Sequence, residues 1–354
     1  YLDALETLSM GVLEKINLGL VGAAGRRGNP TKHGSKIDFG QMCELLGSVR
    51  VHAVCDIDPI GLYDAQSQLG ADEAYTDYDD MLNRSDLDAV FIGTPMPYHV
   101  PQSVAAIQKG IHVLSEVPAG ISLEDCKQLV NACRDSNAIY MMGENFTYTL
   151  PNQIVKEIVR QGLLGVPYYA EGEYLHELKQ QNEATKWRRK WQTGINGVTY
   201  GTHSLGPILQ WMIGDRVDRV CAAGSGHHYA DQQNKKYEHE DTCVMLCKMV
   251  SGALVKIRID MLSDRPHSMM NYQLQGTDGC YESARAPGES NRIWIRSRGD
   301  NSQVWTDLSE IADEFLPAAW RDYGDVASKS GHSGGDFIEL VDFDTNSVKI
   351  PSLP

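Results

Sequence analysis

The chain has 354 residues, 42% of them hydrophobic, which is enough to build two domains that each have a core. Its net charge of −15 argues against nucleic acid as a partner, because binding to phosphates needs clustered Lys and Arg. No apolar run reaches the roughly 18 residues that a membrane-spanning helix needs. These quantities favour an acidic, soluble enzyme.

The eight cysteines include no C-x-x-C pair, and we expect them to be reduced thiols of the core. The chain begins at Tyr1 and not at Met, so an export signal, if the protein has one, is not present in this chain. A cytoplasmic and a periplasmic or exported location therefore both stay open.

Short apolar segments alternate with helical patterns between Ile16 and Glu144. One helix is predicted to begin at Ser122, because Ser122 and Asp125 form a capping-box pattern. Alternation of strands with helices predicts a parallel sheet that is covered on both faces. The predicted strands are residues 16–21, 49–56, 87–92, 112–115 and 139–142.

After Pro151 the pattern changes to strands in close succession, separated by short turns. Such strands predict an antiparallel or mixed sheet. The fold class is therefore α/β, with a doubly wound Rossmann domain followed by an α+β domain that has a large open sheet. The predicted division is an N-terminal extension over residues 1–15, a nucleotide-binding domain over 16–148 and an α+β domain over 149–354.

The first predicted strand runs into a glycine-rich turn, G-A-A-G-R-R-G, at residues 22–28. Such a turn lets backbone N–H groups approach a pyrophosphate at a helix N-terminus, although Ala24 stands where the second glycine of the usual motif belongs. Asp56 ends the second strand, where a carboxylate accepts hydrogen bonds from ribose hydroxyls. Its charge favours NAD over NADP, whereas the two arginines of the turn could hold a 2′-phosphate. The turn contributes Gly22, Gly25, Arg26, Arg27 and Gly28 to the predicted NAD site.

Three further strand ends carry proline or polar residues, and the ligand of a doubly wound sheet lies over the carboxyl ends of its strands. We therefore expect these ends to form a shelf for the nicotinamide. They contribute Thr94, Pro95, His99, Glu116, Val117 and Asn145, the last of them next to Glu144.

The glycine loop at Gly22–Gly28, the run L-Q-G-T-D-G at Leu274–Gly279 and several motifs between them resemble one known family over nearly the whole chain, the Gfo/Idh/MocA sugar-directed oxidoreductases. Four of them resemble a narrower branch, the NAD-dependent glycosidases of glycoside hydrolase family 109, typified by α-N-acetylgalactosaminidase. They are E-V-P-A from Glu116, M-M-G-E-N from Met141, A-E-G-E-Y from Ala170 and Y-G-T-H-S-L-G-P from Tyr200. The runs D-M-L-S-D-R-P-H-S from Asp260 and Y-Q-L-Q-G-T-D-G from Tyr272 are similar to the same branch.

The resemblance implies hydrolysis through transient oxidation of the sugar at C3, removal of the C2 proton, loss of the glycosidic oxygen, addition of water and re-reduction. Many relatives of the dehydrogenase type have lysine where this chain has Val117, which cannot relay a proton. The proton transfers must then fall to residues of the second domain, and Tyr and His are suited to them. By the resemblance the catalytic residues are Tyr200, His203 and Tyr148, and the substrate residues are Glu116, Tyr174, Arg265 and His267.

The sequence departs from the branch at three places. Gly201 replaces a proline, and His267 stands where a tyrosine is common, which puts the choice of sugar in doubt. The tail is short, as if residues were missing between Phe343 and Asp344. The family also implies a homo-oligomer, a dimer or tetramer, formed through the outer face of the second sheet.

Two other segments invite different hypotheses. Residues 226–241 concentrate histidines and acids, but a polar connection between strands explains them better than a metal site, and no metal is predicted. W-R-R-K-W, from Trp187 to Trp191, fits either a sugar cleft or cofactor phosphate, or a surface loop.

The sequence thus leaves three functions open. The first is an NAD-dependent glycosidase that acts on a sugar or glycoside, and the second is a net NAD(P)-dependent sugar dehydrogenase that releases a keto-sugar. The third is an NAD-binding regulatory protein without catalysis. The sugar, the anomer and the aglycone are not determined by the sequence.

Overall fold

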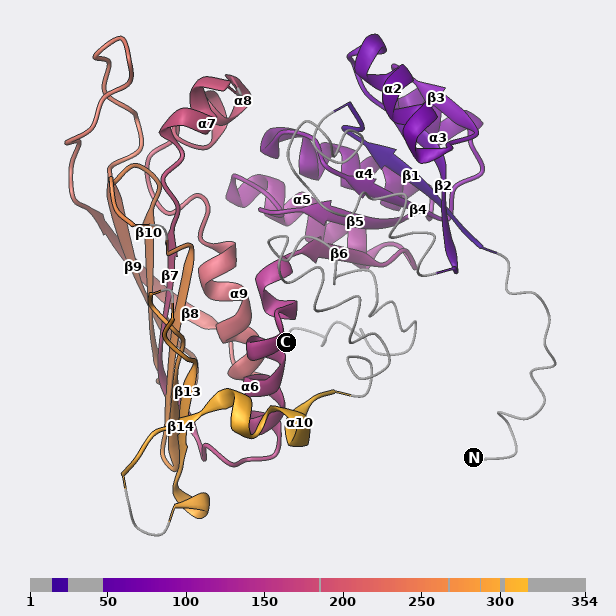
Figure 1. Cartoon of the computed structure of the whole chain (residues 1–354). Helices are drawn as coiled ribbons and strands as arrows, with labels where there is room; N and C mark the ends of the chain where they lie inside the picture. Colours follow the sequence, from indigo (N-terminus) through magenta and orange to yellow (C-terminus); the bar gives the residue numbers. More distant parts are fainter. Residues whose placement is uncertain are drawn as a thin grey trace, which may run out of the picture. The chain divides into compact units, whose positions relative to one another are not determined.

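The computed structural model describes residues 15–24, 47–184, 186–266, 268–286, 288–299 and 303–317. Its chain contacts divide into two compact units, one that ends at Gly143 and one that begins at Glu144. Each unit is built around a sheet of its own, sheet A in the first and sheet B in the second (Figure 1).

Sheet A has six strands in the order β3-β2-β1-β4-β5-β6, and all of its pairings are parallel. This is the doubly wound arrangement that the sequence predicts, with β1 and β4 at the centre where the strand order reverses. The strands are β1 (Ile16–Val21), β2 (Val49–Cys55), β3 (Glu73–Tyr75), β4 (Ala89–Ile92), β5 (His112–Glu116) and β6 (Tyr140–Gly143).

Helices of the first unit follow the strands as crossovers. α2 and α3 pack on β2 and β3, whereas α4 packs on β4 and β5, and α5 packs on α4. Right-handed crossovers place α2 on one face of the sheet and α3 and α4 on the other, where Met81 of α3 shares a core with Val100 and Ile107 of α4. Ser122 caps α5 by accepting from Asp125 N at 3.0 Å, so the predicted helix start is confirmed. The helices are α2 (Pro59–Leu69), α3 (Tyr78–Arg84), η2 (Met96–Tyr98), α4 (His99–Gln108) and α5 (Leu123–Arg134).

Sheet B has eight strands in the order β14-β13-β12-β11-β7-β10-β9-β8. Only the β7–β10 pairing is parallel, so the predicted mixed sheet is confirmed. The strands are β7 (Pro167–Leu175), β8 (Val217–Gly224), β9 (Thr242–Met249), β10 (Leu254–Asp260), β11 (Met270–Gly276), β12 (Gly279–Glu282), β13 (Arg292–Ile295) and β14 (Thr306–Asp307).

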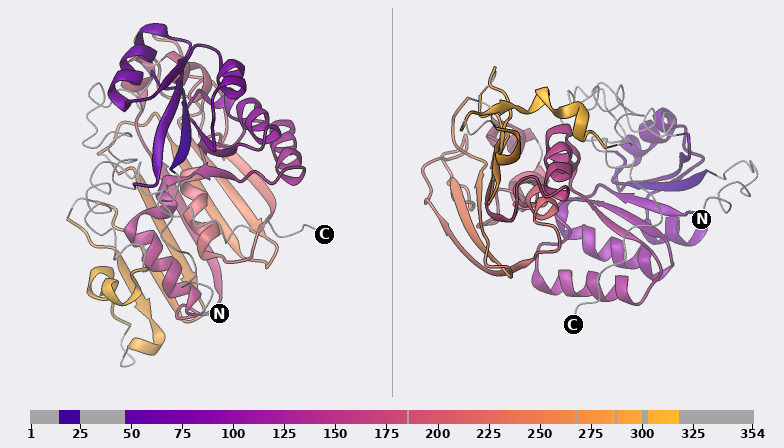
Figure 2. Two further views of the ribbon diagram at one scale, coloured as in Figure 1. Left: turned by 90° about the vertical axis from the view of Figure 1, so that its right-hand side faces the viewer. Right: turned by 90° about the horizontal axis from the view of Figure 1, so that it is seen from below.

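One face of sheet B is covered by α6 and α9, which also pack on each other (Figure 1, Figure 2). The core between helices and sheet contains the fully buried Trp211 and Tyr281, whose rings meet nearly at right angles. The helices of the second unit are η3 (Asn145–Tyr148), α6 (Leu150–Arg160), α7 (Lys179–Ala184), α8 (Lys186–Trp191), α9 (Thr202–Trp211), η4 (Arg296–Arg298), η5 (Leu308–Glu310) and α10 (Ala312–Phe315).

α9 lies unusually close to β7, and glycine makes this approach possible. A Cβ added at Gly172 would lie 2.0 Å from the carbonyl oxygen of Ser204. Alternation along β7 turns Gly172 and Tyr174 toward α9 and turns Glu171 and Glu173 to the other face, where their partners are Lys and Arg.

Several sequence expectations differ from the structure. The three-residue strand β3 is not predicted, because so short a segment carries no period. W-R-R-K-W forms the helix α8, not a loop. Of the seven described cysteines, all free, Cys221 is exposed on the edge strand β8 and does not belong to the core. Among the helices of the described residues, none combines the length and the apolar character needed to cross a bilayer.

We expect Gly172→Ala to lower the free energy of unfolding of the second unit by about 3 kcal/mol, because the methyl group would meet rigid backbone. Gly201→Ala is the control: its Cβ would lie 3.0 Å from a side-chain methyl of Val198, and its φ of −78° suits alanine. Denaturant unfolding of both variants checks this prediction, and an equal loss of unfolding free energy in the two variants would contradict it.

Candidate functional site

The turn after β1 has the geometry of a nucleotide cradle. Gly22 has a φ of +84°, and a Cβ there would lie 2.8 Å from the carbonyl oxygen of Gly93. Glycine is therefore required at the central edge of sheet A, and it leaves backbone open to a pyrophosphate. The other predicted members of this turn, Gly25, Arg26, Arg27 and Gly28, lie outside the described residues.

Asp56 follows β2 and is tied to the same turn. Its Oδ2 accepts from Ala24 N at 2.8 Å, and its Oδ1 accepts from Asp58 N at 3.0 Å. A carboxylate oxygen has two lone pairs, so each oxygen can still accept a bond from a ribose hydroxyl. These residues fit NAD: a glycine turn for the pyrophosphate and an acid for the ribose.

A buried histidine joins two of the predicted strand ends. His99 is 1% exposed; its Nε2 lies 2.7 Å from the Thr94 carbonyl oxygen and its Nδ1 lies 2.8 Å from that of Pro118. Since both oxygens are acceptors, both bonds form only when both ring nitrogens carry a proton. His99 thus ties the turn after β4, with Thr94 and Pro95, to the turn after β5.

The turn after β5 contains Glu116 and Val117. Glu116 is half-buried, whereas Val117 is 5% exposed and is joined to Pro118 by a cis peptide bond. The valine offers no group that could take or give a proton, as the sequence predicts.

The second unit contains a buried histidine–carboxylate pair. His203, in the first turn of α9, places Nδ1 2.7 Å from Oε1 of Glu144, which directly follows β6. The exposed fractions of the two side chains are 9% and 5%. Among the described residues the Nε2 atom of His203 has no hydrogen-bond partner, so it is the ring atom available to a ligand.

Aromatic side chains surround this histidine. The rings of Phe146, Tyr174 and Tyr200 have centroids 4.9, 5.5 and 5.2 Å from the His203 ring, and Phe146 and Tyr200 present edges to it. Tyr174 also lies 5.4 Å from Tyr200. Three residues that the sequence predicts for the site, Tyr174, Tyr200 and His203, are therefore brought together.

The backbone of His203 is fixed as well. Pro207 lies four residues later in α9 and has no N–H to donate to the His203 carbonyl. The buried Tyr272 supplies the donor instead, with its hydroxyl 2.6 Å from that oxygen. Burial raises the pKa of Tyr272 well above its usual range, so the phenol stays a donor.

Tyr174 has a second partner, His176, whose Nδ1 lies 2.7 Å from the tyrosine hydroxyl. Tyr148 and Asn145 lie on η3, the short helix that also carries Phe146. Arg265 is exposed in the connection after β10, and His267 lies outside the described residues. No described contact joins Arg265 to the aromatic cluster.

The histidine-rich connection between β8 and β9 is partly buried, which differs from the solvated loop that its composition suggests. His239 is fully buried, and its backbone N–H donates to the Thr193 carbonyl at 3.1 Å. Glu240 and Asn196 add side-chain bonds between the same two segments. The connection therefore fixes the segment that leads to Tyr200. Within the described ranges no three His, Cys, Asp or Glu side chains form a group that could hold a metal.

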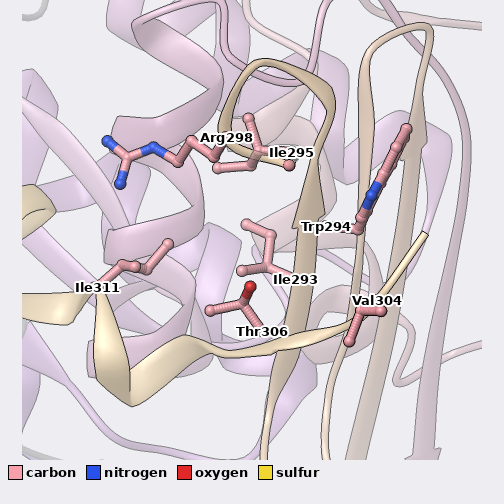
Figure 3. Close-up of a pocket in the computed structure, with 8 residues that line it drawn as sticks. Ile293, Trp294, Ile295, Arg298, Val304, Thr306 and Ile311 are labelled. Carbon is pink, nitrogen blue, oxygen red and sulfur yellow. The ribbon is translucent and has the colours of Figure 1, made fainter. Parts of the chain in front are cut away.

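A hollow of about 460 Å³ lies elsewhere, at the β13–β14 end of sheet B, and none of the predicted site residues lines it. Ile293, Ile295 and Ile311 face one another across it, while Trp294 points to the other side of the strand (Figure 3). Arg298 and Thr306 add polar groups to its lining, but no residue predicted for catalysis or for the cofactor lies there.

Sequence reasoning misses two residues of the cluster, Phe146 and His176, and it misses the partner of Glu144. Glu144 is visible as a polar residue at a strand end, but nothing in the sequence pairs it with a histidine 59 positions away. His176 follows Tyr174 by two, which on a strand places both on one face, and this signal could have found it.

Comparison with known proteins agrees with this arrangement. Residues 16–144 match the oxidoreductase family with an NAD-binding Rossmann fold, and residues 148–350 match the glycosyl hydrolase 109 C-terminal domain. A glycosyl hydrolase family 109 protein of Shewanella pealeana is 31% identical over 93% of this chain and 76% of its own length. An α-N-acetylgalactosaminidase of Shewanella oneidensis is also 31% identical, over 93% of this chain and 75% of its length.

Solved structures share the fold. The WlbA dehydrogenase of Bordetella pertussis, in complex with NADH and UDP-GlcNAcA, is similar with a TM-score of 0.68 at 25% identity, covering 92% of this chain and 85% of its own. A levoglucosan dehydrogenase in complex with NADH and levoglucosan has a TM-score of 0.66 at 18% identity, covering 93% and 90%. Together with the match to the NAD-binding Rossmann family, the likeness to WlbA confirms the Rossmann domain and NAD as the cofactor.

We expect Asp56→Ala to weaken NAD binding about tenfold, because a charged acceptor is lost from the ribose site. The affinity for NADP should fall less, since a repulsive charge is removed, so the NADP-to-NAD affinity ratio rises. Calorimetric titration with both nucleotides measures this. Asp77→Ala is the control: it removes a carboxylate that also accepts a backbone N–H, at the start of α3, and should leave both affinities unchanged.

Burial holds the pKa of His239 below its ordinary value of 6.5, so the folded protein keeps this ring neutral. The unfolded chain binds a proton there below about pH 6.5, and stability must therefore fall as the pH drops from 7.5 to 5.5. His239→Gln should flatten this slope, and the exposed His227→Gln should not. Unfolding midpoints across the range provide the check; parallel slopes would contradict it.

Proposed function

The chain belongs to glycosyl hydrolase family 109, and from this we propose that it removes a terminal α-linked N-acetylgalactosamine from a glycoside. It is an NAD-dependent glycosidase with an oxidoreductase fold, as its two matching family domains require. The sugar is proposed because a relative with 31% identity over most of the chain is an α-N-acetylgalactosaminidase.

The observation that carries the chemistry is the cluster around His203. It combines one imidazole with two phenols, those of Tyr174 and Tyr200, and with a buried carboxylate. Imidazole and phenol can both exchange protons near neutral pH when their surroundings tune them. In the E-V-P turn of the first unit, the position that holds lysine in many relatives is the buried Val117, whose side chain cannot exchange a proton.

When bound, NAD supplies a reversible hydride acceptor for a sugar carbon, so hydrolysis needs no external oxidant. Oxidation of the sugar alcohol also releases its hydroxyl proton, which returns on re-reduction. For the elimination the chain itself must move two protons: one from the carbon next to the oxidised position and one to the departing glycosidic oxygen. We assign the first to Nε2 of His203, the ring atom that has no hydrogen-bond partner in the described part of the chain, and the second to the phenol of Tyr200. Tyr148 is a further proposed catalytic group on η3.

Binding roles follow the same proposal. Tyr174 would contact the sugar, and Arg265, His267 and Glu116 would contribute to its selection. The hydroxyls of Thr199 and Thr202, which flank Tyr200 in the sequence, are buried without a hydrogen-bond partner among the described residues. Such groups need a polar ligand or water. The proposed cofactor residues are Gly22, Gly25, Arg26, Arg27, Gly28, Asp56, Thr94, Pro95, His99, Glu116, Val117 and Asn145.

His99 is proposed to act by positioning backbone and not by direct contact with the nicotinamide. Both of its ring nitrogens are committed to backbone carbonyls, so we expect it to hold the two turns in place for the nicotinamide. A homo-oligomer formed through the outer face of sheet B, a cytoplasmic or exported location and the division at residues 148 and 149 stay predictions.

A net sugar dehydrogenase is the second candidate, and the WlbA dehydrogenase at 25% identity favours it. The two functions differ in what accumulates. A dehydrogenase forms one NADH for each sugar oxidised, whereas the proposed glycosidase returns the hydride in the same turnover.

We expect the purified protein with NAD to release nitrophenol from 4-nitrophenyl N-acetyl-α-galactosaminide without accumulating NADH, and to exchange the C2 hydrogen in deuterated water. Tyr200→Phe and His203→Asn should each lower kcat/KM on the order of 100-fold, the usual contribution of a positioned acid or base. Tyr168→Phe, at an exposed tyrosine on β7, is the matched control and should keep full activity.

Stoichiometric NADH without release of nitrophenol would replace the glycosidase with the dehydrogenase. Product without deuterium at C2 would exclude removal of the C2 proton. Full activity in both the Tyr200 and the His203 variant would remove these residues from the chemistry.

A further inference from the structure

Four hydrogen-bond contacts to the Glu144 carboxylate are found among the described residues. Its Oε1 accepts from Phe146 N at 3.2 Å, and its Oε2 accepts from Thr147 N at 2.8 Å and from the Thr147 hydroxyl at 2.5 Å. Backbone N–H groups cannot reverse their role, so this end of η3 requires an acceptor. The fourth contact is Nδ1 of His203 at 2.7 Å from Oε1.

The carboxylate determines which ring nitrogen of His203 carries the proton. Since an ionised carboxylate only accepts, Nδ1 must be the donor, and the neutral ring then has its lone pair on Nε2. We infer that Glu144 is a positioning residue that holds His203 in the Nδ1–H form, so that Nε2 is the atom that takes the proton. This inference rests on the proposed function for its chemistry but not for its geometry.

The surroundings leave the pair only one arrangement. A Cβ at Gly206, one turn after His203, would lie 2.6 Å from Oε2 of Glu144, so the helix keeps glycine where the carboxylate fits. Tyr272 fixes the backbone of His203, and the rings of Phe146, Tyr174 and Tyr200 enclose its imidazole. The ring can therefore neither turn away nor find another partner for Nδ1 within the described residues.

A glutamine at position 144 would move the proton of the His203 ring from Nδ1 to Nε2. Its single amide oxygen is needed by Thr147, which donates both its backbone N–H and its hydroxyl to Oε2, so the NH₂ group would face Nδ1 of His203. Nδ1 would then have to accept, and the proton would move to Nε2. The substitution keeps the size and shape of the side chain at position 144, but Nε2 of His203 can then no longer accept a proton.

The test combines a spectroscopic readout with kinetics. Imidazole ¹⁵N shifts of the NAD-loaded protein, assigned by the signal lost in His203→Asn, should show Nδ1 protonated in the native chain and Nε2 protonated in Glu144→Gln. Hydrolysis of 4-nitrophenyl N-acetyl-α-galactosaminide by Glu144→Gln should lose kcat on the order of 100-fold with KM changed by less than about threefold.

Two variants separate positioning from loss of stability. Gly206→Ala displaces the Glu144 carboxylate without changing its charge and should lower kcat, as Glu144→Gln does. Glu173→Gln removes an equally buried carboxylate from the opposite face of β7, where it pairs with Arg258 and Arg285, and should leave kcat and the ¹⁵N shifts unchanged.

The inference is overturned if the native chain has Nε2 protonated, or if Glu144→Gln keeps its tautomer or keeps kcat within about twofold. It is also overturned if Glu173→Gln reproduces the loss, because burial alone would then explain it. If the native chain hydrolyses no N-acetylgalactosaminide, the proposed function fails, and the ¹⁵N shifts still decide whether Glu144 sets the tautomer.

Discussion

A carboxylate buried at the end of β6 is the constraint on which the second unit's site depends. Burying an ionised group is costly unless donors surround it, and Glu144 meets this demand with the start of η3 and with His203. The same atoms therefore cap a helix and orient an imidazole. Local folding and catalytic geometry are coupled here through one side chain.

Close packing of α9 follows from that coupling. The helix has to approach both β7 and Glu144, and it does so with Gly172 on one side and Gly206 on the other. Pro207 frees the His203 carbonyl, and Tyr272 from β11 takes it. These four residues thus fix the backbone of His203, and its imidazole ring is the part that can take part in the reaction.

In the first unit, backbone and not side chains is left exposed at the carboxyl ends of the central strands of sheet A. Gly22 prevents a side chain from filling the space at the end of β1, and Asp56 holds the turn through Ala24 N. His99 ties two further turns together from within. Proton-active groups are scarce at Val117 and plentiful around His203, a distribution that suits an enzyme whose cofactor moves hydride and whose chain moves protons.

The sequence by itself determined the alternation of strands and helices, the mixed second sheet, the glycine turn and the motifs that contain Tyr174, Tyr200 and His203. These features are local, because they depend on period, on turn residues and on short spacings. The tertiary structure alone decided that Glu144 meets His203, that Tyr272 replaces the donor missing at Pro207, and that His239 is buried. Those contacts join residues far apart in the chain, and only the packing of helix against sheet brings them within hydrogen-bond distance.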